Sequence, residues 1–169
     1  FLEAQIEADL DGILVVDGQQ QRIQINRRMI ELFSIPEQLL QDENDEPLLQ
    51  FVMGKVKYPG PFLEKVRFLY AHPEQTSRDE IECKDGKILD RYSSPVRDAS
   101  GKLYGRIWAF RDITDLKQME KQLRDKIQEL ETFNRFVVDR ELKMIELKAQ
   151  IARLEQQVRV PEAGGKPFV

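Results

Sequence analysis

The sequence predicts an α+β domain, a five-stranded antiparallel sheet with helices inserted between strands two and three, followed by one long helix. Three observations carry this prediction. Short β-branched segments bounded by Asp-Gly and Ser-Gly turns occur at both ends of residues 11–114. Helical spacing of apolar residues fills the middle of that range. Residues 115–160 contain neither Gly nor Pro, as expected for an uninterrupted helix.

The first strand is expected at residues 12–17, a β-branched segment that ends in an Asp-Gly turn. A second strand over 21–26 completes a hairpin. Residues 27–33 change to helical spacing, and this helix ends before Pro36. The acidic residues of 42–46 are interpreted as the solvated N-terminus of the next helix, where carboxylates complement the helix dipole.

Another amphipathic helix is expected from Pro61, a residue suited to a first helical turn, and it ends at His72 and Pro73. Three strands are expected to follow, separated by Asp-Gly and Ser-Gly turns. They cover residues 78–83, 87–96 and 103–110.

The composition suits one folded domain with an appendage. The 169 residues are 41% hydrophobic and 33% charged, enough to bury one core. Residues 1–114 hold 15 Lys+Arg against 20 Asp+Glu, net −5, and residues 115–169 hold 11 against 10, net +1. Such a balance offers no basic field for a nucleic-acid partner. No run of about 18 apolar residues occurs, so no membrane span is expected.

Several motifs within residues 11–114 follow one another in a specific order. The chain begins this series with Asp-Gly-Ile-Leu-Val-Val-Asp at 11–17, Ile-Asn-Arg at 25–27 and Glu-Leu-Phe at 31–33. The more specific motifs are Asp-Gly-Lys at 85–87, Arg-Tyr-Ser at 91–93, Pro-Val-Arg-Asp at 95–98, Gly101, Gly-Arg-Ile-Trp at 105–108 and Phe-Arg-Asp-Ile-Thr at 110–114. Together they resemble the PAS family of sensor domains. The resemblance implies a PAS fold, with helices on one face of the sheet surrounding a small cavity.

The resemblance also suggests which residues line that cavity. Period two places Tyr104, Arg106, Trp108 and Phe110 on one face of the last strand, and the family turns the Phe110 face inward. Trp108 and Phe110 are then either plain core or an aromatic wall for a small ligand. The full set of ligand-binding candidates is Arg91, Trp108, Phe110, Met29 and Ser93.

Arg91 is anomalous because it lies mid-strand between Leu89 and Ser93, on a face expected to be partly apolar. A buried guanidinium needs a carboxylate partner, since an unpaired buried charge is very costly. In one interpretation Arg91 pairs with an acidic neighbour such as Glu82, or lies on the exposed face. In the other, it clamps the carboxylate of a small organic acid through bidentate hydrogen bonds.

Cysteine and histidine each occur once, as Cys83 and His72. Intrachain disulfides, Cys-rich zinc sites and His-pair metal sites are therefore excluded, and no metal site is expected. Flavin-binding relatives carry a reactive helix cysteine in an Asn-Cys-Arg-Phe-Leu setting, whereas Cys83 falls on an expected strand. Haem-binding relatives use a helix histidine, whereas His72 precedes Pro73 at a helix end. Both chromophores are disfavoured, and the cofactor stays unknown.

The long helix carries a heptad series. Seven apolar residues recur at seven-residue intervals, which indicates a coiled coil. The companion seam changes side around residues 133–141, as a phase shift requires. Residues 133–148 also resemble a linker found after PAS domains in bacterial sensors. A parallel homodimer is the leading hypothesis, with its seam at Leu116, Leu123, Leu130, Val137, Met144, Ile151 and Val158.

Asp112 and Thr114 lie between the last predicted strand and this helix. Thr114 is a reasonable N-cap, and by resemblance the two residues form a signal-transfer junction. The expected organisation is a flanking helix at 1–10, a PAS sensor domain at 11–114, a dimeric signalling helix at 115–158 and a flexible tail or linker at 159–169. A start at Phe1 rather than Met suggests an excised piece.

These features predict a sensory or regulatory module of bacterial signal transduction, such as a two-component system. It would bind a small ligand or sense a signal, and transmit it through the coiled coil to an output domain, a histidine kinase or diguanylate cyclase, absent from this chain. The alternative is a ligand-free scaffold for dimerisation. No catalytic constellation is found, so no enzymatic activity of its own is expected. The expected compartment is the reducing cytoplasm.

Overall fold

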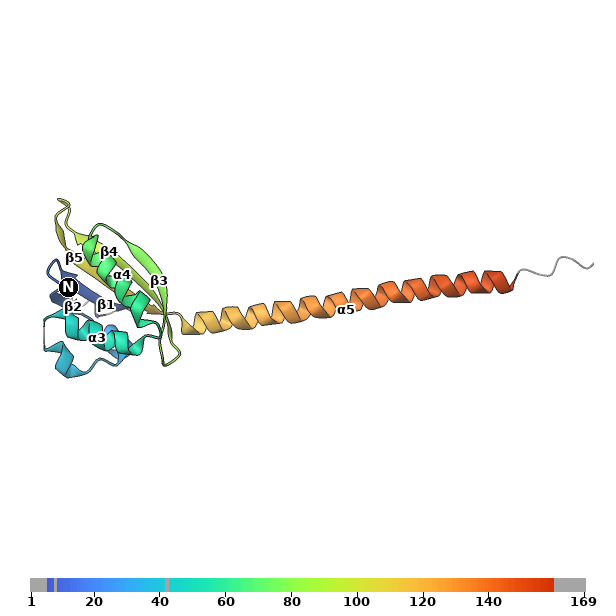
Figure 1. Cartoon of the computed structure of the whole chain (residues 1–169), viewed down its shortest axis with the longest axis horizontal. Helices are drawn as coiled ribbons and strands as arrows, with labels where there is room; N and C mark the ends of the chain where they lie inside the picture. The colour runs from blue at the N-terminus through green and yellow to red at the C-terminus, as the bar shows by residue number, and fades with distance from the viewer. Residues whose placement is uncertain (1–5, 8, 42, 160–169) are drawn as a thin grey trace, which may run out of the picture. The chain divides into compact units, whose positions relative to one another are not determined.

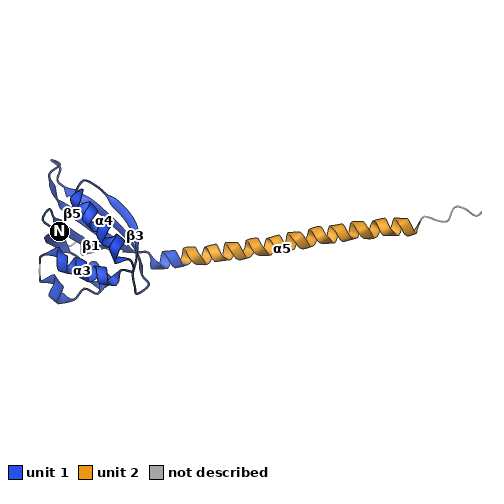
Figure 2. Ribbon diagram, viewed as in Figure 1, with its two compact units in different colours: residues 1–118 blue, residues 119–169 orange. Residues whose placement is uncertain are grey.

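The computed structural model describes residues 6–7, 9–41 and 43–159 of the chain. It divides into two compact units, residues 1–118 and residues 119–169, which are coloured separately in Figure 2. Of the predicted flanking helix at 1–10, Ile6 and Glu7 are helical, and most of the rest lies outside the described residues. The same is true of the predicted tail, of which only Arg159 is described.

Unit 1 is built on a five-stranded sheet in which every neighbouring pair of strands is antiparallel. The strands lie in the order β2-β1-β5-β4-β3, so the last strand of the chain pairs with the first. Figure 1 shows them side by side, with α3 and α4 packed against them. The strands are β1 (Gly12–Asp17), β2 (Arg22–Ile25), β3 (Ser77–Glu82), β4 (Ile88–Arg97) and β5 (Leu103–Asp112).

Four helical segments are inserted between β2 and β3, as the sequence predicts. They are α2 (Arg27–Phe33), the 3-10 helix η1 (Glu37–Leu40), α3 (Asp45–Lys55) and α4 (Pro59–Ala71). Proline occupies the first turn of α4, where its missing N–H is not needed. For all five strands, and for α2 and α4, the observed first and last residues lie within two residues of those predicted from the sequence.

The core lies between one face of the sheet and helices α2, α3 and α4. Alternate strand residues turn toward this face, as the pleat of a strand requires. Buried apolar residues of all three helices belong to the same cluster. Its members from β1, β4 and β5 are Leu14, Val16, Leu89, Trp108 and Phe110.

Asn26 ties β1 to the start of α2. Its buried Oδ1 accepts hydrogen bonds from the backbone N–H groups of Ile13, at 2.8 Å, and Met29, at 2.9 Å. Its Nδ2 donates to the carbonyl oxygens of Ile6 and Asp11. One side chain therefore caps the helix and satisfies backbone groups of two other segments.

The long helix α5 (Thr114–Val158) spans 45 residues and confirms the predicted helix, beginning one residue earlier. None of its residues is buried. At ~1.5 Å per residue it is about 65 Å long. No helix in the part of the chain that the structure describes combines the length and the apolar character needed to cross a bilayer.

Candidate functional site

A small cavity lies inside unit 1, between the sheet and helices α2, α3 and α4. Its volume is about 30 Å³, room for one water-sized group. Eight of its lining residues are apolar and buried or half-buried, and the remaining three are Asp45, Tyr70 and Trp108. The apolar lining consists of Leu14, Met29, Leu48, Leu49, Val52, Phe62, Val66 and Phe110.

The three polar residues form one pole of this cavity. The hydroxyl of Tyr70 donates to Oδ2 of Asp45 at 3.3 Å. The rings of Tyr70 and Trp108 meet edge to face, with centroids 5.9 Å apart. Two buried polar atoms at this pole, Asp45 Oδ1 and Trp108 Nε1, have no hydrogen-bond partner. A native structure rarely leaves such atoms unsatisfied, so they mark a place where a polar group fits.

Burial governs the protonation of Asp45. Only 5% of the residue is exposed, and loss of solvation raises the pKa of its carboxyl group from 3.8 to about 6. The hydrogen bond from Tyr70 and the charge of Arg22 act in the opposite direction and limit this rise in pKa. Burial and the Asp45 charge also raise the pKa of the Tyr70 hydroxyl, which therefore stays protonated and donates.

The structure corrects the prediction for the acidic residues of 42–46. Asn44 caps α3, and Glu46 is exposed at its N-terminus as expected. Asp45, by contrast, turns into the core rather than toward solvent. The neighbour that buries it, Tyr70, lies 25 residues further along the chain on α4, so a local pattern of charges could not reveal the contact.

Arg91 of β4 is buried, with only 2% of its side chain exposed. It donates from Nε and Nη2 to the two carboxylate oxygens of Asp79 on β3, at 2.9 and 2.7 Å. The guanidinium also lies 4.6 Å from the centroid of the Phe62 ring and 5.6 Å from that of Trp108. The pairing with an acidic neighbour is thus present, but the suggested partner, Glu82, is wrong.

The register of the sheet explains this difference. Asp79 stands opposite Arg91 in the β3–β4 ladder, whereas Glu82 stands opposite Ile88. Glu82 instead pairs with Lys57, at 2.7 Å. Since Arg91 Nη1 is buried without a partner, the ion pair does not use its full hydrogen-bonding capacity.

Ser93 and Arg106 form a second buried polar pair beside the cavity. Arg106 donates from Nη1 to Ser93 Oγ at 3.0 Å, and from Nη2 to the carbonyl oxygens of Pro73 and Gln75. The Ser93 hydroxyl donates to the carbonyl of Ile107. These bonds hold the chain after α4 against the sheet, which is a structural task.

The five ligand-binding candidates therefore fall into two groups. Met29, Trp108 and Phe110 line the cavity, whereas Arg91 and Ser93 do not. Arg91 lines a separate pocket of about 180 Å³ on the outer side of Phe62, together with Asp79. Asp45 and Tyr70 are polar cavity residues that are missing from the sequence-based candidates.

The single cysteine and histidine occupy unlike positions. Cys83 is buried, and loss of solvation raises the pKa of its thiol to about 11, so it is protonated at neutral pH. His72 is exposed and stacks on Phe68, with ring centroids 4.3 Å apart. Among the described residues, no three Asp, Glu, His or Cys side chains gather in a way that could hold a metal ion.

Asp112 and Thr114 connect the end of β5 to the start of α5. The Asp112 carboxylate accepts from the Thr114 backbone N–H at 3.0 Å and from its hydroxyl. Thr114 Oγ1 in turn accepts from the backbone N–H of Ile88 at 3.0 Å. Thr114 is therefore the first residue of the helix and bonds to β4, rather than capping a helix amide as predicted.

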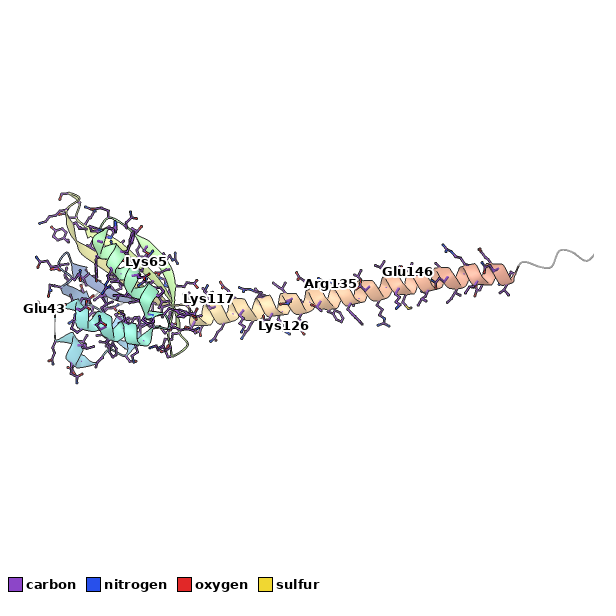
Figure 3. All side chains as sticks on the ribbon, in the orientation of Figure 1. Glu43, Lys65, Lys117, Lys126, Arg135 and Glu146 are labelled. Atoms are coloured by element: carbon purple, nitrogen blue, oxygen red, sulfur yellow. The ribbon has the colours of Figure 1, made fainter. Side chains whose placement is uncertain are left out.

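The predicted seam of α5 is exposed to solvent along its whole length. The exposed fraction of its seven residues runs from 38% at Val137 to 85% at Val158. Charged side chains such as Lys126, Arg135 and Glu146 project from the helix between them, as Figure 3 shows.

Comparison with known proteins agrees with this architecture. The family model described as "PAS fold" matches residues 8–121. No curated protein matches the chain. Among solved structures, the PAS domain of BvgS from Bordetella pertussis is 18% identical with a TM-score of 0.54, and the match covers 76% of this chain and 96% of that one.

Two further solved structures are similar over part of their length. An RNA-binding light-oxygen-voltage receptor is 16% identical with a TM-score of 0.52, over 75% of this chain and 36% of that one. The sensor region of a sensor histidine kinase is 17% identical with a TM-score of 0.49, over 63% of this chain. The present chain spans only 40% of that structure. At these identities the likeness concerns the fold, and the family model carries the assignment: the chain belongs to the PAS family.

Proposed function

We propose that the chain is a sensory module of a bacterial, cytoplasmic signal-transduction protein. It transmits a signal through a dimeric coiled coil to an output domain, a histidine kinase or a diguanylate cyclase, that lies outside this chain. The observation that carries the proposal is a PAS domain whose last strand runs directly into a 45-residue helix with an exposed apolar stripe.

The exposed stripe supports a dimer. Isolated helices are marginal in water, and most of their stability in proteins comes from packing an apolar face. The seven seam residues have no such packing in the single chain. A second copy, aligned in parallel, would bury them at the a or d positions of a coiled coil.

The seam also offers a mechanism for passing on a signal. The companion apolar positions change side around residues 133–141, so the two helices cannot keep one regular packing throughout. A joint of this kind can adopt two packings of similar energy, and a rotation of the sensor end would favour one of them. Asp112, Thr114 and Ile88 form the link through which the sheet would act on the helix.

The cavity supports a sensing role for the PAS domain. Two unsatisfied polar atoms inside an aromatic cavity suit a small polar ligand better than a plain core. We infer no catalytic activity for the chain itself. The single cysteine is a protonated thiol, and the buried polar or charged side chains among the described residues are Asn26, Asp45, Arg91, Ser93 and Arg106.

A second candidate is a ligand-free dimerisation scaffold. The small size of the cavity, about 30 Å³, favours it, because ordinary ligand pockets measure roughly 300–1,000 Å³. In that case the aromatic residues of the cavity act as core, and the coiled coil is the functional part.

Native mass spectrometry of the chain purified from its producing cells separates the two candidates. The sensory proposal predicts a dimer of the 19.8 kDa chain that carries a small molecule, lost after denaturation and refolding. A dimer that repeatedly carries no added mass favours the scaffold. A chain that is monomeric in this experiment contradicts both.

A further inference from the structure

We propose that the cavity of unit 1 selects a small primary ammonium ion, best of all one with a neighbouring hydroxyl group, and that Asp45 accepts its N–H bonds. The inference rests on the proposed sensory function and names the ligand class of that site.

The first observation is the unpartnered oxygen of Asp45. The residue is 95% removed from solvent, and its Oδ2 receives the hydroxyl of Tyr70 while Oδ1 receives nothing. A buried carboxylate is stable only when it is paired and hydrogen-bonded. An ammonium group supplies both a donor for Oδ1 and a compensating charge, whereas an anionic ligand would face the carboxylate with a like charge.

The second observation is the aromatic wall around this oxygen. Tyr70, Trp108, Phe62 and Phe110 all line the same cavity. Aromatic faces attract cations within about 6 Å of their centroids, and the attraction is larger where water is excluded. A carboxylate combined with several aromatic faces is therefore suited to an organic cation.

Two arginines lie against the same tryptophan and must be accounted for. Arg91 and Arg106 lie 5.6 and 5.9 Å from the Trp108 centroid. Arg91 is paired with Asp79, and Arg106 donates to Ser93 and to backbone carbonyl groups. Neither lines the cavity. They limit the affinity for a cation without occupying its place at Asp45.

The third observation concerns the second group of the ligand. Trp108 Nε1 is a buried donor that acts on the nearby Tyr70 hydroxyl, lowering its pKa, but completes no hydrogen bond. A hydroxyl oxygen separated from an ammonium nitrogen by two carbon atoms can accept from this indole while the nitrogen donates to Asp45. An amino alcohol thus satisfies both of the unpaired polar atoms that belong to the cavity residues, and a simple alkylammonium satisfies one.

Size sets the upper limit on the ligand. The cavity of about 30 Å³ holds an ammonium-sized group, so a two-carbon amine needs some movement of the walls. Leu49, Val66 and Tyr70 line both this cavity and a surface groove of about 410 Å³ between α3 and α4. Because these side chains line both spaces, we infer that a movement of Leu49 could join them and admit a larger ligand.

The test uses the full chain and the fluorescence of Trp108, which is the only tryptophan in the sequence. Ethanolamine, ethylammonium and ethanol are titrated at pH 7.5. Saturable changes are expected with ethanolamine and, more weakly, with ethylammonium, and none with ethanol. A response to ethanol as strong as that to the amines, or no saturable response to any probe, overturns the proposal.

The pH dependence is a second readout on the unmodified chain. Because Asp45 binds a cation only when ionised, and its pKa is about 6 in the free protein, the affinity for ethanolamine should fall about tenfold between pH 7.5 and pH 5. The other charged or titratable groups that act on this carboxyl are Tyr70, Arg22 and Glu46. An affinity that does not vary over this range contradicts a role for Asp45.

Substitution completes the test. Asp45→Asn keeps the shape and removes the charge, and should lower the affinity for ethanolamine at least tenfold. Glu64→Gln makes the same change at an exposed position of α4 and should leave the affinity unchanged. If Asp45→Asn is folded and binds as the original does, the proposal is wrong. If no amine binds but native mass spectrometry finds another bound molecule, the sensory function survives and only this ligand class is rejected.

Discussion

Units 1 and 2 differ in the kind of side chain that lies in an unfavourable environment: charged side chains are buried in unit 1, and apolar side chains are exposed in unit 2. Unit 1 buries charged residues and gives them partners, as in the pair of Arg91 with Asp79. Among the described residues of unit 2 nothing is buried, and it is the apolar side chains that lie in water. The difference supports the proposal that unit 2 packs its apolar stripe against a second copy of the chain.

The same contrast holds for ion pairs. The guanidinium of Arg91 is buried, with 2% of its side chain exposed, whereas its partner Asp79 is 36% exposed, so removal of the Asp79 charge leaves a buried charge uncompensated. Lys126 and Glu129 meet at 2.8 Å on the surface of α5, with both side chains largely exposed. Pairs of the second kind contribute little, because water and salt screen them.

The largest expected loss of stability comes from a substitution that disrupts the sheet of unit 1. A Cβ on Gly105 would lie 1.9 Å from the carbonyl oxygen of Val16 on the neighbouring strand, so Gly105→Ala must separate β1 from β5. We expect it to lower the free energy of unfolding by more than about 3 kcal/mol, measured by urea denaturation.

Gly60→Ala is the matched control, because a Cβ there meets nothing within 4 Å and the residue is helical. It should leave stability unchanged or raise it by up to about 1 kcal/mol. If both substitutions lower the free energy of unfolding equally, the close approach of Gly105 to Val16 does not explain the effect.

The second effect compares the two kinds of ion pair. Asp79→Asn leaves a buried guanidinium without its counter-charge and should destabilise unit 1 by about 3 kcal/mol. Glu129→Gln removes the acidic partner of the exposed pair and should change stability by less than about 0.5 kcal/mol. Thermal unfolding followed by circular dichroism measures both effects. Equal shifts in the unfolding temperature would show that the buried and the exposed ion pair contribute equally to stability.

The third effect depends on pH. The folded state raises the pKa of Asp45 from 3.8 to about 6, so between these values the unfolded chain binds fewer protons and stability from this group falls as pH rises. Ionised Asp45 therefore costs about 3 kcal/mol at neutral pH. Asp45→Asn should be the more stable protein at pH 7.5, by about 2 kcal/mol, and should lose this advantage by pH 4. A difference that is constant with pH would mean that Asp45 does not titrate in this window.

The smallest effect lies at the junction of sheet and helix. Thr114→Val removes the oxygen that accepts from the Ile88 N–H and should lower the stability of unit 1 by about 1 kcal/mol. Thr132→Val removes an exposed hydroxyl on α5 and should be neutral within about 0.5 kcal/mol. Differential scanning calorimetry can resolve the two, and an effect of Thr132→Val as large as that of Thr114→Val would argue against a special junction.

The fold could be predicted from the sequence because the residue patterns that mark its turns and helices are local. Asp85-Gly86 and Ser100-Gly101 mark the last two turns, and the absence of Gly and Pro defines α5. The need of Arg91 for a carboxylate follows from the alternation of its strand. The predicted partner, Glu82, lies three residues from the true partner, Asp79, and therefore on the opposite face of β3, so the alternation that places Asp79 with the buried Ile81 could have excluded it.

The cavity could be predicted only in part, because some of its residues meet through contacts between distant segments of the chain. Met29 stands on the apolar stripe that helical periodicity predicts, Trp108 and Phe110 stand on the strand face that the family resemblance turns inward, and all three line the cavity. Asp45 belongs to an acidic segment that reads as solvated, and only the packing of α3 against α4 brings it to Tyr70. The one available signal was that a tyrosine on the apolar face of α4 requires a polar partner when buried.

Sedimentation equilibrium tests the central claim most directly, namely that unit 2 needs a second copy of itself. The full chain at tens of micromolar should sediment as a dimer of the 19.8 kDa chain, and Leu130→Glu in the seam should convert it to a monomer with unit 1 still folded. Leu142→Glu, the same change at an exposed position outside the seam, should stay dimeric. A chain that is monomeric without substitution, or that dimerises equally well with Leu130→Glu, would contradict the account.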